Sequence, residues 1–175
     1  PYLVGHQKAD YCSIDMIQRV LYFGARYLDL EIFNKELKAE TVPVVTSGYK
    51  KASMKLSLNS LNCDEVFEII KKVAFSEEFV DNYNDPLFIF LDLKTNNNIS
   101  SLDKLHDIII KYFGNRLLDK EYNHSNLADV SLCKLKGKVI IMSSDGYQDS
   151  KLDKIINCST DKPYLQRITY HDLRN

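Results

Sequence analysis

The sequence has no excess of charge of either sign and no long hydrophobic run. It contains 23 lysines and arginines against 24 aspartates and glutamates, for a net charge of −1, so nothing indicates attraction to nucleic acid or to anionic lipid. A bilayer span needs roughly 18 apolar residues, whereas the longest run here is Leu87–Leu91. No transmembrane segment is therefore predicted. The sequence also shows no charged-then-apolar leader at Pro1. No feature of it indicates an oligomeric state.

Zinc-type and nucleotide-binding motifs are also absent. The cysteines form no C-x-x-C pair and have no histidines near them at zinc spacing; they are Cys12, Cys63, Cys133 and Cys158. We expect them to be buried, reduced thiols, which favours an intracellular, cytoplasmic location. The lack of a glycine-rich phosphate loop counts against a nucleotide-binding α/β protein.

What the sequence does contain is an alternation of helical and strand patterns. Apolar residues recur at helical spacing after Ser13, after Asn62 and along residues 102–113, and Glu65 stands at the capping-box position of the second helix. Strands are predicted for residues 26–33, 42–46, 87–93, 138–143 and 164–170.

This alternation indicates βαβ units and a parallel sheet. The 175 residues suffice for one domain with its own core, and no second domain or internal repeat is evident. The strands are too few to close an eight-stranded barrel. Two alternatives therefore stay open: an open doubly wound sheet, or part of a barrel whose first strand and C-terminal part lie outside residues 1–175.

Three carboxylates fall where parallel strands end. Successive side chains of a strand point to opposite faces, so Asp29 and Glu31 lie on the same face of the first predicted strand. Asp92 lies near the C-terminal end of its own strand. Because parallel sheets are covered on both faces, such carboxylates are seldom left to solvent. Their convergence would suit a hard cation such as calcium. The alternative is pairing with Arg26, Lys94 or solvent, and spacing alone does not decide between the two.

Four segments, in order, resemble the X region of phosphoinositide-specific phospholipase C. Residues 24–33 (GARYLDLEIF) follow its Gly-Cys-Arg and Glu-Leu-Asp-Cys-Trp elements, and residues 42–49 (VPVVTSGY) its Pro-x-x-x-His-Gly-Tyr-Thr. Residues 86–92 (PLFIFLD) resemble Pro-Val-Ile-Leu-Ser-Leu-Glu, and residues 135–141 (LKGKVII) resemble Leu-Lys-Gly-Lys-Ile-Leu-Leu. The resemblance covers most of residues 2–144.

The resemblance implies an α/β fold of the TIM-barrel type, a distorted (β/α)₈ barrel of which this chain is the N-terminal portion. It implies a phosphoric diester hydrolase that uses calcium to cleave inositol phospholipids into diacylglycerol and inositol phosphate, peripherally at a membrane surface. Carried over by position, Asp29, Glu31 and Asp92 are the calcium ligands. Calcium is then expected to raise the melting temperature.

The chain departs from the family pattern at its catalytic groups. The family's second catalytic histidine falls on Ser47, and its first His-Asn pair would precede Pro1. A serine hydroxyl cannot shuttle protons near neutral pH, and the loss of one such group typically lowers the rate about 10²–10⁴-fold. Two lysine positions that hold inositol phosphates in the family fall on Met142 and Ser144, which removes charge-assisted contacts to phosphate.

Two functional hypotheses follow. One is a phosphodiesterase of this family with impaired activity, and the other is a catalytically inactive barrel kept as a binding or assembly module. The remaining histidines are each expected to be exposed or structural, not replacements for the lost group; they are His6, His106, His124 and His171.

Overall fold

The computed structural model of the chain describes residues 2–5, 10–49, 54–163 and 165. Its helices are α1 (Ile14–Tyr22), α2 (Cys63–Ala74), α3 (Ile99–Phe113) and α4 (Leu132–Leu135). Its strands are β1 (Tyr27–Asn34), β2 (Pro43–Val45), β3 (Gly48–Tyr49), β4 (Met54–Lys55), β5 (Leu61–Asn62), β6 (Leu87–Lys94), β7 (Val139–Ser143) and β8 (Cys158–Ser159). None of these helices is long and apolar enough to cross a membrane.

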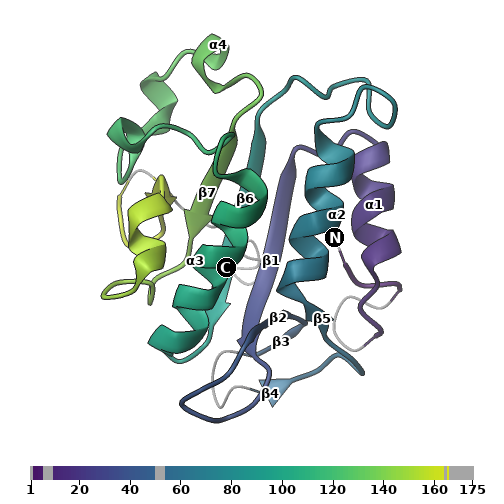
Figure 1. Cartoon of the computed structure of the whole chain (residues 1–175), viewed down its shortest axis with the longest axis vertical. Helices are drawn as coiled ribbons and strands as arrows, with labels where there is room; N and C mark the ends of the chain where they lie inside the picture. Colours follow the sequence, from purple (N-terminus) through teal and green to yellow (C-terminus); the bar gives the residue numbers. More distant parts are fainter. Residues whose placement is uncertain (1, 6–9, 50–53, 164, 166–175) are drawn as a thin grey trace, which may run out of the picture.

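A six-stranded sheet forms the centre of the fold, in the order β5-β2-β1-β6-β7-β8 (Figure 1). Strands β1, β6, β7 and β8 run parallel to one another. The long pairing of β1 with β6 runs in register from Tyr27 opposite Phe88 to Phe33 opposite Lys94. The C-terminal ends of the two longest strands therefore lie side by side.

Helices α1 and α2 begin where the sequence predicts, whereas α3 begins at Ile99, three residues before the predicted stretch 102–113. The Ser13 hydroxyl accepts from the Asp15 N–H at 3.2 Å and caps α1, and Asn98 caps α3 by accepting from the Ser101 N–H at 3.0 Å. Gly24, just past the end of α1, has a φ of +86°, a left-handed conformation that glycine adopts without steric cost.

The two faces of the sheet pack against different layers. Leu28, Leu30 and Ile32 of β1 are buried in a core shared with the apolar faces of α1, α2 and α3, and Figure 1 shows these helices on one side of the sheet. Side chains alternate along a strand, so Asp29 and Glu31 lie on the opposite face. There a second, smaller core surrounds Phe90, Ile140 and Met142, with Leu118, Leu135 and Cys158.

The prediction of a parallel sheet is correct for its centre and wrong for one edge. Strand β2 pairs antiparallel with β1, and β5 pairs antiparallel with β2. A parallel pair needs a crossover of about a dozen residues or more, usually a helix. Residues 35–42, between β1 and β2, contain no helix, so the chain reverses as a hairpin.

Three smaller predictions also need correction or lie outside the description. Glu65 accepts from the Asn62 side-chain amide at 3.3 Å, and the Asn62 side chain makes no cap hydrogen bond to the helix, so the capping box does not form. The predicted strand 164–170 lies outside the described residues except for Leu165, which belongs to no strand. All four cysteines are free thiols, but Cys133 is exposed instead of buried.

The start of β3 requires glycine at position 48. A Cβ there would lie 2.1 Å from the Met54 carbonyl oxygen and 2.9 Å from the Lys55 Cα, both backbone atoms of the paired strand β4. We expect Gly48→Ala to lower the free energy of unfolding by about 2 kcal/mol, because the backbone must move to relieve the overlap. Urea denaturation measures this, with Tyr49→Ser at the exposed neighbouring position as a control. Equal stabilities of the two variants would contradict this packing.

Candidate functional site

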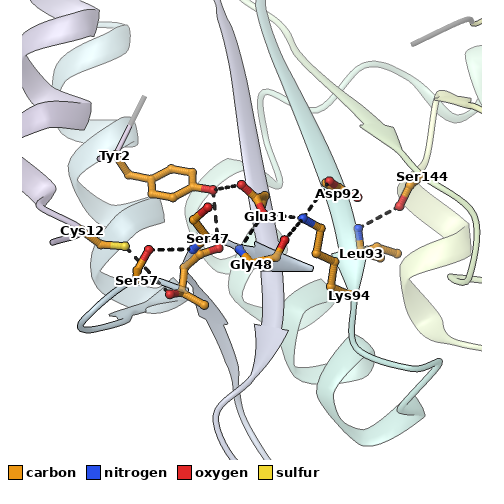
Figure 2. A network of polar contacts seen from close by, with 11 residues as sticks. Tyr2, Cys12, Glu31, Ser47, Gly48, Ser57, Asp92, Leu93, Lys94 and Ser144 are labelled. Atoms are coloured by element: carbon orange, nitrogen blue, oxygen red, sulfur yellow. Dashed lines mark hydrogen bonds and ion pairs between the residues drawn. The ribbon is translucent and has the colours of Figure 1, made fainter. Parts of the chain in front are cut away.

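Strands β1 and β6 bring the predicted carboxylates to one face of the sheet. Glu31 stands directly opposite Asp92, and Asp29 stands opposite Phe90, two residues earlier along the same strands. This is the face that the long helices do not cover. Glu31 and Asp92 lie toward the C-terminal ends of β1 and β6 (Figure 2), where active sites of barrel enzymes are found.

Glu31 accepts hydrogen bonds from three protein donors. The Tyr2 hydroxyl donates to Glu31 Oε1 at 2.9 Å, and the Gly48 N–H donates to Oε2 at 3.1 Å. The Lys94 ammonium donates to the same Oε2. These donors come from the N-terminal segment, the start of β3 and the end of β6 (Figure 2), so Glu31 joins three parts of the chain.

Lys94 lies between the two opposed carboxylates. Besides Glu31, its ammonium contacts Asp92 Oδ2 at 3.5 Å and donates to the Gly48 carbonyl at 2.7 Å. Its side chain is only 12% exposed, and its nitrogen lies 5.6 Å from the centre of the Phe33 ring, a cation–π distance. An ammonium offers three N–H donors, and three oxygen partners surround this one.

Glu31, Asp92 and Lys94 form a group that we call the Glu31 cluster. Tyr2 contacts this cluster as a neutral hydrogen-bond donor. Burial, followed by the negative charge of Glu31, raises the pKa of the Tyr2 hydroxyl well above its usual range, and the charge of Asp29 acts in the same direction. A tyrosinate at this position would face two carboxylates in a site with little water. The hydroxyl therefore stays protonated and available to donate.

We expect Tyr2→Phe to lower the free energy of unfolding by about 2 kcal/mol at neutral pH, because Glu31 loses a charge-assisted hydrogen bond. The wild-type protein should also lose stability as the pH rises above about 10, since Tyr2 ionises in the unfolded chain but stays protonated in the folded one. Tyr2→Phe should reduce this alkaline loss. Urea denaturation from pH 7 to 11 measures both effects, and exposed Tyr11→Phe is the control; identical curves for the two variants would contradict the contact.

The arrangement does not fit a calcium ion as it stands. In the described part of the chain, no group of three histidine, cysteine, aspartate or glutamate side chains is placed to hold a metal ion. Calcium takes six to eight oxygen ligands, whereas Glu31 is engaged by protein donors and Lys94 lies between Glu31 and Asp92. The calcium role of Asp29, Glu31 and Asp92 stays a prediction, and pairing with Lys94 is the alternative that these contacts favour.

Ser47 lies beside the Glu31 cluster, in the short connection between β2 and β3. The N–H of the next residue, Gly48, donates to the Glu31 carboxylate. It is buried, its N–H donates to the Ser57 hydroxyl at 3.1 Å, and its carbonyl accepts from the Leu56 N–H at 2.7 Å. Figure 2 shows Ser47 next to Gly48 and close to Ser57. The scaffold thus places this residue next to the carboxylates, with a side chain that lacks the chemistry of a histidine.

The other two departures from the family pattern serve the fold. Met142 packs in the second core on the same face of the sheet, and the Ser144 hydroxyl accepts from the Leu93 N–H at 2.8 Å, which joins the ends of β6 and β7. Neither side chain offers a positive charge to a phosphate.

The described histidines contact aspartates outside the Glu31 cluster. His106 Nδ1 lies 2.9 Å from Asp107 Oδ1 on α3, and His124 Nε2 lies 3.2 Å from Asp153 Oδ1. His6 and His171 are outside the described residues.

A cavity of about 220 Å³ adjoins the cluster at the ends of β1 and β6. Lys35, Lys55 and Lys94 line it together with Phe33 and Asn34, and also Glu36 and Leu37. A larger cavity of about 510 Å³ lies between the start of α2, α3 and the start of β2. We place the candidate site at the smaller of these two cavities, because Lys94, the partner of Glu31 and Asp92, lines it.

Sequence reasoning missed two of the donors to Glu31. The Tyr2 hydroxyl comes from 29 positions away in the sequence, and the Gly48 N–H from a turn whose course no periodicity describes. Lys94 was foreseen only as one of several partners. The signal that could have singled it out is its spacing of two from Asp92, which puts both side chains on one face of β6.

Comparison with known proteins shows the family and the fold of the chain. The model of the phosphatidylinositol-specific phospholipase C X domain matches residues 1–145. Among solved structures, the chain is similar to PLC21 of L. pealei, with 21% identity, a TM-score of 0.59, and 81% of this chain and 16% of that chain covered. It is also similar to PLC21 of S. officinalis, with 20% identity, a TM-score of 0.63, and 87% and 18% covered. No curated protein matches.

At these identities the structural likeness shows the fold alone, and the chain spans less than a fifth of those two chains. The predicted fold class is confirmed as α/β and TIM-barrel-like, although the described residues form an open sheet and not a closed barrel. The family model covers most of the chain. The chain therefore belongs to the phosphatidylinositol-specific phospholipase C X-domain family.

Proposed function

We propose that this chain is a phospholipase C-like phosphoric diester hydrolase domain whose turnover of inositol phospholipids is strongly impaired. The observation that carries the proposal is the position of Ser47, which stands in the turn held against Glu31 where the family pattern has a catalytic histidine. The family match supports the substrate class, an inositol phospholipid presented at a membrane surface.

The impairment follows from what phosphodiester cleavage demands. The attacking hydroxyl must lose a proton, and the leaving oxygen must gain one, so groups with a pKa near the working pH are needed close to the phosphate. Ser47 has no such group. Met142 and Ser144 bring no positive charge to hold the phosphate, so proton transfer and charge stabilisation are weakened separately. The family generally uses calcium, but here the carboxylates of Glu31 and Asp92 are ion-paired with Lys94, which weakens their binding of calcium.

A second candidate function is binding without turnover. The lysine-lined cavity at Lys94 favours it, because Lys35 and Lys55 there offer positive charge to a phosphorylated headgroup even where proton transfer is lost. The described chain has a buried apolar core and capped helices α1 and α3. A module that holds an inositol phospholipid at a membrane surface would need no more than this.

The test is to incubate the full-length protein with phosphatidylinositol vesicles and calcium, and to measure both inositol phosphate release and sedimentation with the vesicles. An active phospholipase C is the positive control. We expect release at least about 100-fold below that control. Sedimentation without release would favour the binding module, and release at ordinary enzyme rates would overturn the proposed impairment.

A further inference from the structure

The ammonium of Lys94 lies where the negative charges of the site meet. Glu31 and Asp92 are direct partners across the β1–β6 pair, and Phe33 and Lys94 are the next partners on the same face. The lysine side chain therefore returns from the end of β6 over the preceding pair of residues. Its nitrogen contacts Glu31, Asp92 and the Gly48 carbonyl (Figure 2).

The two carboxylates that contact this ammonium are themselves fixed in place, Glu31 by other donors and Asp92 by burial. Glu31 is also bound by Tyr2 and by the Gly48 N–H, and Asp92 is buried. Moving Glu31 toward another ligand breaks contacts on three segments. This differs from an exposed surface pair such as Lys104 with Glu40, at 3.4 Å, whose glutamate side chain is 87% exposed and which contributes little to stability.

We propose that Lys94 is a built-in replacement for the divalent cation, so that the chain itself neutralises part of the negative charge of this cluster and closes it to calcium. A calcium ion would need six to eight oxygen ligands at about 2.3–2.6 Å. To enter, it must displace the ammonium, which would leave a lysine charge confined beside a divalent ion. The inference rests on the phospholipase C-like assignment only for the expectation of a cation there.

A consequence is that removal of the ammonium should open the site. Lys94→Met keeps much of the apolar stem and removes the charge, which leaves Glu31 and Asp92 facing each other with Asp29 on the same face. Like-charged carboxylates so placed favour the binding of a cation. The variant should therefore gain calcium affinity that the wild-type protein lacks.

The experiment is metal titration of the wild-type protein, Lys94→Met and Lys94→Gln, with Lys104→Met as the matched control. Terbium is the luminescent probe for hard cations, because the Tyr2 ring next to Glu31 can sensitise it, and calcium-dependent melting is the second readout. We expect saturable terbium binding, displaced by calcium, only in the Lys94 variants. Their melting temperature should rise by roughly 4 °C at calcium about tenfold above Kd.

Saturable binding with a melting shift in the wild-type protein would overturn the proposal. So would Lys94 variants that fold and show no more metal binding than Lys104→Met. If Lys94→Met does not fold, Lys94→Gln, which retains a donor for the Gly48 carbonyl, carries the same test. No substrate is involved, so the outcome is independent of whether the proposed phospholipase function holds.

Discussion

Replacing Ser47 by histidine is expected to raise inositol phosphate release from the full-length protein by about 100-fold, the lower end of what one general acid–base group contributes. The turn that carries Ser47 is already fixed against Glu31 through the Gly48 N–H and against Ser57 through the Ser47 N–H. The backbone of position 47 is thus already fixed next to the carboxylates, where the family pattern has a histidine.

The matched control is Ser47→Gln, which has a similar size but cannot exchange a proton near neutral pH. Because position 47 is buried, the melting temperatures of both variants must be compared first. Equal release by the histidine and glutamine variants, with both folded, would show that Ser47 is not what limits turnover.

Lys94→Met is expected to lower the free energy of unfolding by about 3 kcal/mol in the absence of metal. The Lys94 and Asp92 side chains are each 12% exposed, and Glu31 is 20% exposed. Removing one partner from a mostly buried ion pair leaves an uncompensated charge, which is more costly than losing a surface pair.

A double-mutant cycle with Glu31→Gln isolates the pair. Glu31→Gln removes the charge that Lys94 neutralises, so the double variant should be more stable than the sum of the two single effects predicts, by about 1.5 kcal/mol or more. Urea denaturation of the four proteins measures the coupling. Additive effects would mean that the contact does not contribute to the folded state.

Much of the fold could be predicted from periodicity, because helix and strand periods report directly on which side chains are buried. The apolar residues at helical spacing after Asn62 include Val66, Phe67 and Ile70, which are buried in α2, and Leu28 and Leu30 of the predicted strand 26–33 are buried in β1. The antiparallel edge could not be read in this way, since alternation is the same in parallel and antiparallel strands. The length of the β1–β2 connection was the relevant signal.

The candidate site was predictable only in part, for a different physical reason. The register of β1 and β6 places Glu31 opposite Asp92, and the alternation of side chains along each strand places both on the same face of the sheet. Which groups neutralise these carboxylates or donate to them depends on long side chains of other residues. A lysine can extend into water or fold back onto the sheet, and the sequence does not show which residue a tyrosine of the N-terminal segment contacts. The contacts of Lys94 and Tyr2 with Glu31 are tertiary.

Whether protein donors or a metal ion hold Glu31 is decided most directly by a crystal structure of the wild-type protein grown in calcium. The contacts of Glu31 predict the Lys94 ammonium between Glu31 and Asp92, with no cation on either carboxylate. A calcium ion bound to Glu31 through oxygen ligands at about 2.3–2.6 Å, with Lys94 turned away, would contradict them.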